Sequence, residues 1–145
     1  MPTTTIETIA VDQRFDRQVA KELSFWWRSQ GADINHVITR FVELPGDRVF
    51  SGPFPLRGRA GAAGDEDLAG AADPAAGMFP FAFVDCVVSR DRDARFRRRY
   101  AQAVRDALNP WVPESRIFVS FRSVDPSDYF TPGAESWAEP SRETS

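Results

Sequence analysis

The residues best suited to chemistry are a proline at position 2 and two arginines, Arg90 and Arg92, that follow an apolar segment. If Met1 is removed, the nitrogen of Pro2 becomes a free secondary amine. Nearby cations and burial lower the pKa of an amine, so arginines beside Pro2 would bring it into the range useful to a general base. The protonated amine is a general acid, and the neutral amine can attack a carbonyl group. If Met1 is retained, Pro2 is an ordinary amide without a basic nitrogen.

Arg90 and Arg92 belong to the segment SRDRDARFRRRY, between a predicted strand and a predicted helix. Two guanidinium groups at this place can bind a carboxylate bidentately, close to a helix N-terminus that favours anions. The four arginines between positions 95 and 99 are interpreted as a solvated helix surface. Without further evidence, Arg90 and Arg92 also fit that simpler interpretation.

The composition excludes several classes of site. Cys86 is the only cysteine, which excludes an internal disulfide, and its apolar neighbours predict a buried, inert thiol. His36 is the only histidine, and no second histidine or cysteine gives metal-ligand spacing, so no metal site is expected. The net charge of −3 and a pI near 5.2 argue against nucleic acid and anionic membranes as partners.

The sequence also predicts the location of the protein. No apolar run approaches the roughly 20 residues that a membrane-spanning helix needs. The N-terminal MPTTTIETIA lacks the basic and apolar blocks of a signal peptide. A cytoplasmic location is therefore expected.

The first half of the chain predicts a strand, a helix and a second strand. Positions 3–10 (TTTIETIA) are rich in β-branched residues and contain no glycine, which is typical of a strand. A helix follows, with Asp12 or Asp16 as its cap and Gly31 at its end. Its apolar face recurs at three- and four-residue spacing through Val19, Leu23, Trp26 and Trp27. Positions 36–44 (HVITRFVEL) form the next strand, which closes at the turn signal Pro45-Gly46-Asp47.

The second half repeats this order. Positions 81–89 form a strand whose nearly continuous apolar character predicts burial on both faces. A helix is predicted from about 93 to 108 and ends at Asn109-Pro110. Its apolar stripe has a four-residue spacing through Phe96, Tyr100, Val104 and Leu108. A last strand covers positions 116–124.

The two halves are spaced as an internal repeat. Arg14 lies 12 positions after Pro2, and Arg92 lies 12 positions after Pro80. Each β-α-β unit returns its second strand parallel to the first by a right-handed crossover. The predicted fold class is therefore α/β: a tandem β-α-β repeat that forms a four-stranded, mostly parallel core sheet with two helices on one face.

One domain is expected over residues 1–145. Its first unit covers about 2–52 and its second about 79–133, and a polar tail covers 134–145. Between the units, about 53–78, the chain is dominated by Gly, Ala, Pro and Asp without a sustained period, which predicts a mobile linker. Such a linker is either a functional flap or a tolerated insertion.

The proline, the repeat, the arginine pair and the turn, in this order, resemble the tautomerase superfamily of amino-terminal proline enzymes. The resemblance covers about residues 2–133 apart from the linker. ELPGDRVFSG (43–52) and RIFVSF (116–121) look most like the cis-3-chloroacrylic acid dehalogenase group, whereas SRDRDARFRRRYAQAV (89–104) looks equally like malonate semialdehyde decarboxylase. The resemblance implies a tautomerase or MIF-like fold, assembly as a homotrimer, Pro2 as the catalytic amine, and Arg90 and Arg92 as carboxylate ligands.

Other family positions carry different residues here. The histidine of the dehalogenases falls on Trp27, their last-strand tyrosine on Ser120, and their water-activating glutamate near Thr131. The aspartate of the decarboxylase falls on Asn35, beside His36. Without these groups, dehalogenation of cis-3-chloroacrylate is not expected.

Three further residues are candidates. Asp128 and Tyr129 can substitute for the missing groups if the last loop bends inward, although a turn residue and a packing aromatic explain them equally well. Arg14 matches an arginine of the short tautomerases only after one inserted residue is allowed.

Two interpretations follow. The first is a small enzyme that acts on a 2-oxo or 3-oxo acid by keto–enol tautomerisation, hydration or decarboxylation and needs no cofactor. In that case Trp27 and Phe50 either wall the pocket or belong to the core or a subunit contact. The second is a non-catalytic protein of the same fold that binds a ligand or serves assembly.

Overall fold

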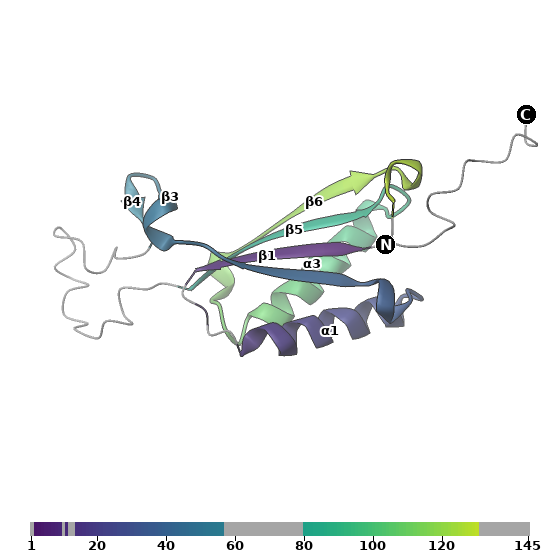
Figure 1. The fold of residues 1–145 in the computed structure, drawn as a ribbon, viewed down its shortest axis with the longest axis horizontal. Coiled ribbons are helices and arrows are strands. Elements are labelled where there is room, and N and C mark those ends of the chain that lie inside the picture. Colours follow the sequence, from purple (N-terminus) through teal and green to yellow (C-terminus); the bar gives the residue numbers. More distant parts are fainter. Residues whose placement is uncertain (1, 10, 12–13, 57–79, 131–145) are drawn as a thin grey trace, which may run out of the picture.

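A computed structural model describes residues 2–9, 11, 14–56 and 80–130 of the chain as a sheet covered on one face by two helices (Figure 1). The first unit comprises β1 (Thr3–Ile9), α1 (Phe15–Ser29) and β2 (Ile38–Glu43). The second comprises β5 (Phe81–Ser89), α3 (Ala94–Leu108) and β6 (Ile117–Val124). The order of strands across the sheet is β2-β1-β5-β6. This arrangement confirms the predicted α/β fold with two β-α-β units.

The strand register shows the repeat directly. β2 is parallel to β1 and β6 is parallel to β5. In both units a residue pairs with the one 35 positions later, as Thr3 does with Ile38 and Ala82 with Ile117. The two units join side by side through β1 and β5, which are antiparallel, and Thr3 lies opposite Val87. The start of β1 and the end of β5 therefore lie at the same end of the sheet.

The core lies between the sheet and the helices. Alternate residues of the central strands, such as Ile6 and Val84, face α1 and α3 and are buried. Trp27 of α1 packs against Phe96 and Tyr100 of α3, with ring centroids 5.2 and 4.9 Å apart. The predicted helix faces are thus buried inside one chain, and within the described residues no helix is long and apolar enough to cross a membrane.

Burial of β5 on both faces was a wrong prediction for the single chain. Buried and half-buried residues alternate along the strand, and the residues on the face away from the helices include Phe83 and Asp85. The continuous apolar run arises because Phe81, Phe83 and Val87 occupy that open face. This face is covered by no helix in the described part of the chain (Figure 1).

The helix boundaries agree with the predicted signals except at the start of α1. Arg14 occupies the N-cap position without capping the helix through its side chain, and Asp16 lies in the first turn, so it is not the cap. Asp12, the other predicted cap, lies outside the described residues. Gly31 has a φ of 93°, a left-handed conformation that ends α1 as predicted. Asp93 caps α3 by accepting a hydrogen bond from the Phe96 N–H at 2.8 Å.

The predicted linker falls largely on residues outside the described ranges, as does the polar tail. Its first residues belong to a short hairpin of β3 (Phe50–Ser51) and β4 (Phe54–Pro55). The hairpin lies at the opposite end of the molecule from the N-terminus (Figure 1). Its anchor is Leu56, which is buried and donates its N–H to the Val49 carbonyl at 2.8 Å.

Candidate active site

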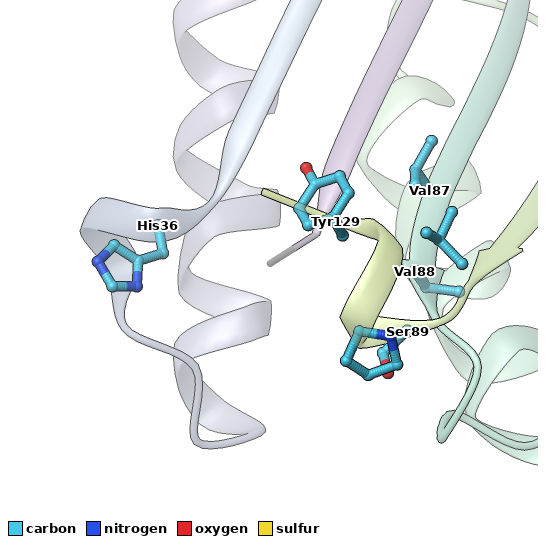
Figure 2. A pocket seen from close by; sticks show the side chains of 7 residues that line it. His36, Val87, Val88, Ser89 and Tyr129 are labelled. Carbon is cyan, nitrogen blue, oxygen red and sulfur yellow. The ribbon is translucent and has the colours of Figure 1, made fainter. Parts of the chain in front are cut away.

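A cavity of about 280 Å³ opens at the end of the sheet where β1 begins (Figure 2). It is bounded by a 3₁₀ turn before β2 (Ile34–His36), by the last residues of β5 and β6, and by a final 3₁₀ turn (Pro126–Asp128) with the residue after it. The described lining residues are His36, Val87, Val88, Ser89, Val124, Pro126 and Tyr129.

The strand register explains why Pro2 belongs to this end of the sheet. Thr3 pairs with Ile38 on one side and Val87 on the other. Pro2 is buried, and its carbonyl accepts a hydrogen bond from the Ile38 N–H at 3.2 Å. The segments on either side of Pro2 therefore both contribute lining residues to the cavity.

The last turn folds back over the start of β1. The Tyr129 hydroxyl lies 2.5 Å from the Thr3 hydroxyl, which places the ring at the cavity. Asp125 organises the turn by accepting hydrogen bonds from the Ser127 N–H at 3.0 Å and the Ser127 hydroxyl at 2.8 Å. These bonds, together with the Arg90 charge, lower the pKa of Asp125. Of the two residues considered for this loop, Tyr129 reaches the cavity, whereas Asp128 is exposed and is not among the lining residues.

Arg90 stands beside the cavity, directly after the lining residue Ser89. Its backbone N–H donates to the Val124 carbonyl at 2.9 Å, which ties the ends of β5 and β6 together. Its side chain is 68% exposed, and one guanidinium nitrogen lies 3.8 Å from an oxygen of Asp125. An exposed ion pair of this length is weak, so the guanidinium can turn to another anion at small cost.

Arg92 is held more firmly than Arg90. Its guanidinium carbon lies 4.4 Å from the centre of the Phe96 ring and 5.7 Å from that of Trp27. Its backbone N–H donates to the Ser89 carbonyl at 3.0 Å. The fold thus brings Pro2, Arg90 and Arg92 to one end of the sheet, while neither guanidinium is among the described lining residues.

Two of the remaining candidates lie away from this end within the single chain. Arg14 precedes α1, which begins at the far end of the sheet because β1 runs away from Pro2 (Figure 1). Ser120 is in the middle of β6 opposite Asp85, on the open face of the sheet, and its hydroxyl lies 3.4 Å from the Val84 carbonyl.

The aromatic residues considered as pocket walls do not line the cavity either. Trp27 is 1% exposed. It therefore belongs to the core, which was the alternative to a place in the pocket wall. Phe50 is 58% exposed in the distant hairpin. Asn35 is exposed next to His36, and Thr131 lies outside the described residues.

His36 lines the cavity, although this was not predicted from the sequence. From the sequence, His36 was considered only as a metal ligand and as the first residue of a strand. The available signal was topological. In a β-α-β unit the second strand begins at the same end of the sheet as the first, so a residue just before β2 lies near Pro2. Within the described residues no group of three or more His, Cys, Asp or Glu side chains could hold a metal ion.

Thr4, Cys86 and Tyr100 form a buried polar cluster between the sheet and α3. The Thr4 hydroxyl is 2.5 Å from the Tyr100 hydroxyl. Burial raises the pKa of Tyr100, and burial raises the pKa of the Cys86 thiol to about 12 against a weaker opposing effect of a hydrogen bond with Thr4. Both groups are therefore neutral near pH 7, which fits the prediction of an inert thiol.

The chain matches no protein-family model and no curated protein sequence. Solved structures do match it. Pt0534 inactivated by 2-oxo-3-pentynoate has a TM-score of 0.65 and 17% identity over 90% of this chain and 92% of its own. FG41 malonate semialdehyde decarboxylase inhibited by 3-bromopropiolate has a TM-score of 0.64 and 11% identity over 92% of each chain.

A third match is the symmetric trimer of wild-type fused 4-OT, with a TM-score of 0.62 and 16% identity over 90% of this chain and 91% of its own. These proteins are tautomerase-superfamily structures. The resemblance seen in the sequence is thus confirmed at the level of architecture, and the chain has the fold of the tautomerase superfamily.

Proposed function

We propose that this chain is a tautomerase-superfamily enzyme that uses the free amine of Pro2 as a general base and acid on a small 2-oxo or 3-oxo acid. The observation that carries the proposal is the position of Pro2, which is buried at the start of β1 beside a cavity of about 280 Å³. Keto–enol tautomerisation is the reaction proposed first, with hydration or decarboxylation as further reactions of the same site. The same Pro2 amine would serve all of these reactions.

The arginines give the substrate its orientation in this proposal. Arg90 and Arg92 hold the carboxylate, and their positive charge lowers the pKa of the nearby amine. Arg90 exchanges its weak contact with Asp125 for the substrate, while Arg92 stays positioned by Phe96. The proton transfers need no organic cofactor, because the amine supplies acid and base while the guanidinium groups stabilise developing charge.

The structural relatives support this substrate class. Pt0534 is inactivated by 2-oxo-3-pentynoate, which is itself a 2-oxo acid, and the FG41 decarboxylase is inhibited by 3-bromopropiolate, a small carboxylate. We extend this ligand class, and not the particular reactions, to the cavity of this chain.

Assembly and location belong to the same proposal. We propose a homotrimer whose sites lie near subunit boundaries, since the open face of the sheet carries exposed apolar residues and one structural relative is a symmetric trimer. We further propose that residues 1–145 form a single domain and that the protein acts in the cytoplasm.

The test is ketonisation of phenylenolpyruvate, measured for the chain that begins at Pro2, a form that retains Met1, and Arg92→Ala. Blocking the amine is expected to reduce the rate to that of buffer. Losing a charge-assisted contact in Arg92→Ala is expected to cost about 1.5–3 kcal/mol, roughly ten- to a hundredfold in kcat/KM. Pro2→Ala keeps a primary amine and is expected to retain part of the activity. Arg98→Ala, an exposed arginine of α3, is the matched control.

A non-catalytic ligand-binding or assembly protein of the same fold is the competing function. The observations that favour it are the burial of Trp27 and the mid-sheet position of Ser120, both at family catalytic positions. Equal rates for the Pro2, Met1-retained and Arg92→Ala forms would show that Pro2 is not the catalytic amine, and conversion by all three at the buffer rate would favour this alternative.

A further inference from the structure

His36 is the feature of the cavity that the proposed function leaves without a role. Figure 2 shows His36 on one side of the cavity with its imidazole turned outward, Val87, Val88 and Ser89 on the other side, and Tyr129 between them. The described lining otherwise consists of apolar side chains, the Ser89 hydroxyl and the Tyr129 hydroxyl, which lies beside Thr3. An imidazole is the only side chain in this set suited to exchanging a proton near neutral pH.

The backbone fixes His36 relative to Pro2. The Asp33 carboxylate accepts a hydrogen bond from the Asn35 N–H at 2.9 Å, and the Asp33 carbonyl accepts one from the His36 N–H at 2.9 Å. Two residues later, the Ile38 N–H donates to the Pro2 carbonyl. A capped turn and a parallel strand pair thus hold the backbone of His36 at the same end of the sheet as Pro2.

The polarity of the cavity suits a proton-transfer pair. Val87, Val88, Val124 and Pro126 give much of the lining an apolar surface, which strengthens electrostatic interactions inside it. No carboxylate is among the described lining residues. His36 is exposed on its outer side, so its imidazole can exchange its proton with water between turnovers.

We propose that His36 is a second acid–base residue of this cavity and protonates the carbonyl oxygen of a 2-oxo acid while Pro2 moves the carbon-bound proton. The inference rests on the proposed function. In enolisation, neutral Pro2 takes a proton from C3, the C–H electron pair forms the C2–C3 double bond, and the carbonyl oxygen takes a proton from the imidazolium. In ketonisation, neutral imidazole removes the enol O–H proton and protonated Pro2 delivers a proton to C3. Neither direction changes an oxidation state.

The first test observes His36 without relying on activity. Because the chain has one histidine, its imidazole Cε1–H signal in a proton–carbon NMR spectrum needs no assignment. Titration with phenylpyruvate is expected to shift this signal in a saturable way. The Arg92→Ala variant is expected to need about tenfold or more ligand for the same shift, and Arg98→Ala is expected to match the native chain. An unchanged signal at millimolar phenylpyruvate would overturn the inference.

The second test shows whether His36 transfers a proton or only contacts the bound ligand. His36→Gln keeps a polar side chain of similar reach but cannot transfer the proton. Its kcat for phenylenolpyruvate ketonisation is expected to fall about a hundredfold, while KM stays within about twofold. Thermal unfolding of the same sample checks that the variant is folded, and His36→Asn serves as a second substitution if it is not.

The outcomes for His36 and Pro2 are distinguishable. Native kcat in His36→Gln, together with loss of activity in the Met1-retained form, would overturn the role of His36 and leave the proposed role of Pro2 standing. Native activity in the Met1-retained form, together with a saturable NMR shift and a low kcat in His36→Gln, would overturn the role of Pro2 and leave that of His36.

Discussion

The two arginines at the Pro2 end of the sheet, Arg90 and Arg92, differ in how much the fold constrains them. Arg92 is stacked on Phe96 in the native chain, so its guanidinium is oriented before any substrate arrives. Arg90 is exposed and forms a weak ion pair with Asp125. Preorganisation lowers the entropy cost of binding, so Arg92 is the arginine whose loss we expect to weaken carboxylate binding more.

The Cys86 thiol is expected to be unreactive in the native protein. Burial raises its pKa to about 12, above the roughly 8.5 of an unfolded cysteine. The stabilisation from keeping the thiol neutral is therefore fully present below about pH 8.5 and is lost as the pH rises toward 12. A colorimetric disulfide reagent at pH 8 should leave the native chain unmodified and react at once with the urea-unfolded chain. Equal rates in the two states would show that Cys86 is accessible.

The chain is expected to release little or no chloride from cis-3-chloroacrylate. The buried Trp27 cannot contact a substrate in the cavity, and Ser120 lies in the middle of the open sheet face. Chloride release is measured with the chain that begins at Pro2 and with the form that retains Met1. Rapid release that depends on a free Pro2 would show that another group activates water, and would refute the matching of these positions to the family.

At the scale of elements, β1 and α3 are joined by a buried hydrogen bond between the hydroxyls of Thr4 and Tyr100. Thr4 and Tyr100 are both almost fully buried, so neither hydroxyl can turn to water if its partner is removed. The bond lies one residue from Thr3, which contacts Tyr129 at the cavity. It therefore ties the strand that carries Pro2 to the helix that follows Arg90 and Arg92.

Removal of this bond is expected to show a clear coupling energy. Tyr100→Phe and Thr4→Val each remove the buried hydrogen bond between the two hydroxyls and should each lower the free energy of unfolding by about 1–3 kcal/mol. The double substitution removes both hydroxyls, so its cost should be smaller than the sum by about 1 kcal/mol. Urea denaturation of the native chain and the three variants gives the four free energies. Strict additivity would mean that the two hydroxyls do not interact.

The elements were predictable from the sequence because their signals are local. Alternation of β-branched residues, the four-residue stripe from Phe96 to Leu108 and the stop at Gly31 each act within a few residues. The start of α1 was not predictable, because the side chain of the N-cap residue Arg14 does not cap the helix and no residue type marks such a start. The apolar spacing of the first helix did place Trp27 on the buried face. The position of His36 at the cavity was not predicted, because it depends on how the strand ends and turns pack, which no local pattern records.

At the scale of the whole molecule, one face of the sheet is covered by no helix of the described chain and carries apolar side chains (Figure 1). Phe83 and Phe118 stack there with ring centroids 5.3 Å apart, and Phe118 is 51% exposed. The apolar faces of the two helices are buried inside the chain. Most exposed large apolar residues of the described chain lie on the strands and on the β3–β4 hairpin, while Phe25 of α1 is also 47% exposed. Contiguous exposed apolar residues of this kind commonly mark contact sites.

We therefore expect light scattering to give three times the 16.3 kDa mass of the chain. Phe118→Asp places a charge on the open face and is expected to yield monomers at micromolar concentration, whereas the surface variant Arg98→Ala should remain trimeric. A native mass equal to one chain would contradict the proposed assembly.

The proposal that Pro2 is a free, reactive amine in an oxo-acid site is tested most directly by the intact mass of the chain after incubation with 2-oxo-3-pentynoate. A free Pro2 amine beside an oxo-acid cavity should add to C4 of the alkyne, form an N–C bond and pass its proton to C3, with no leaving group. We expect one added equivalent per chain, located at Pro2 by peptide mapping, slower addition in Arg92→Ala and none in the Met1-retained form. Absence of an adduct on the Pro2 form, or equal labelling of both forms, would contradict the proposal.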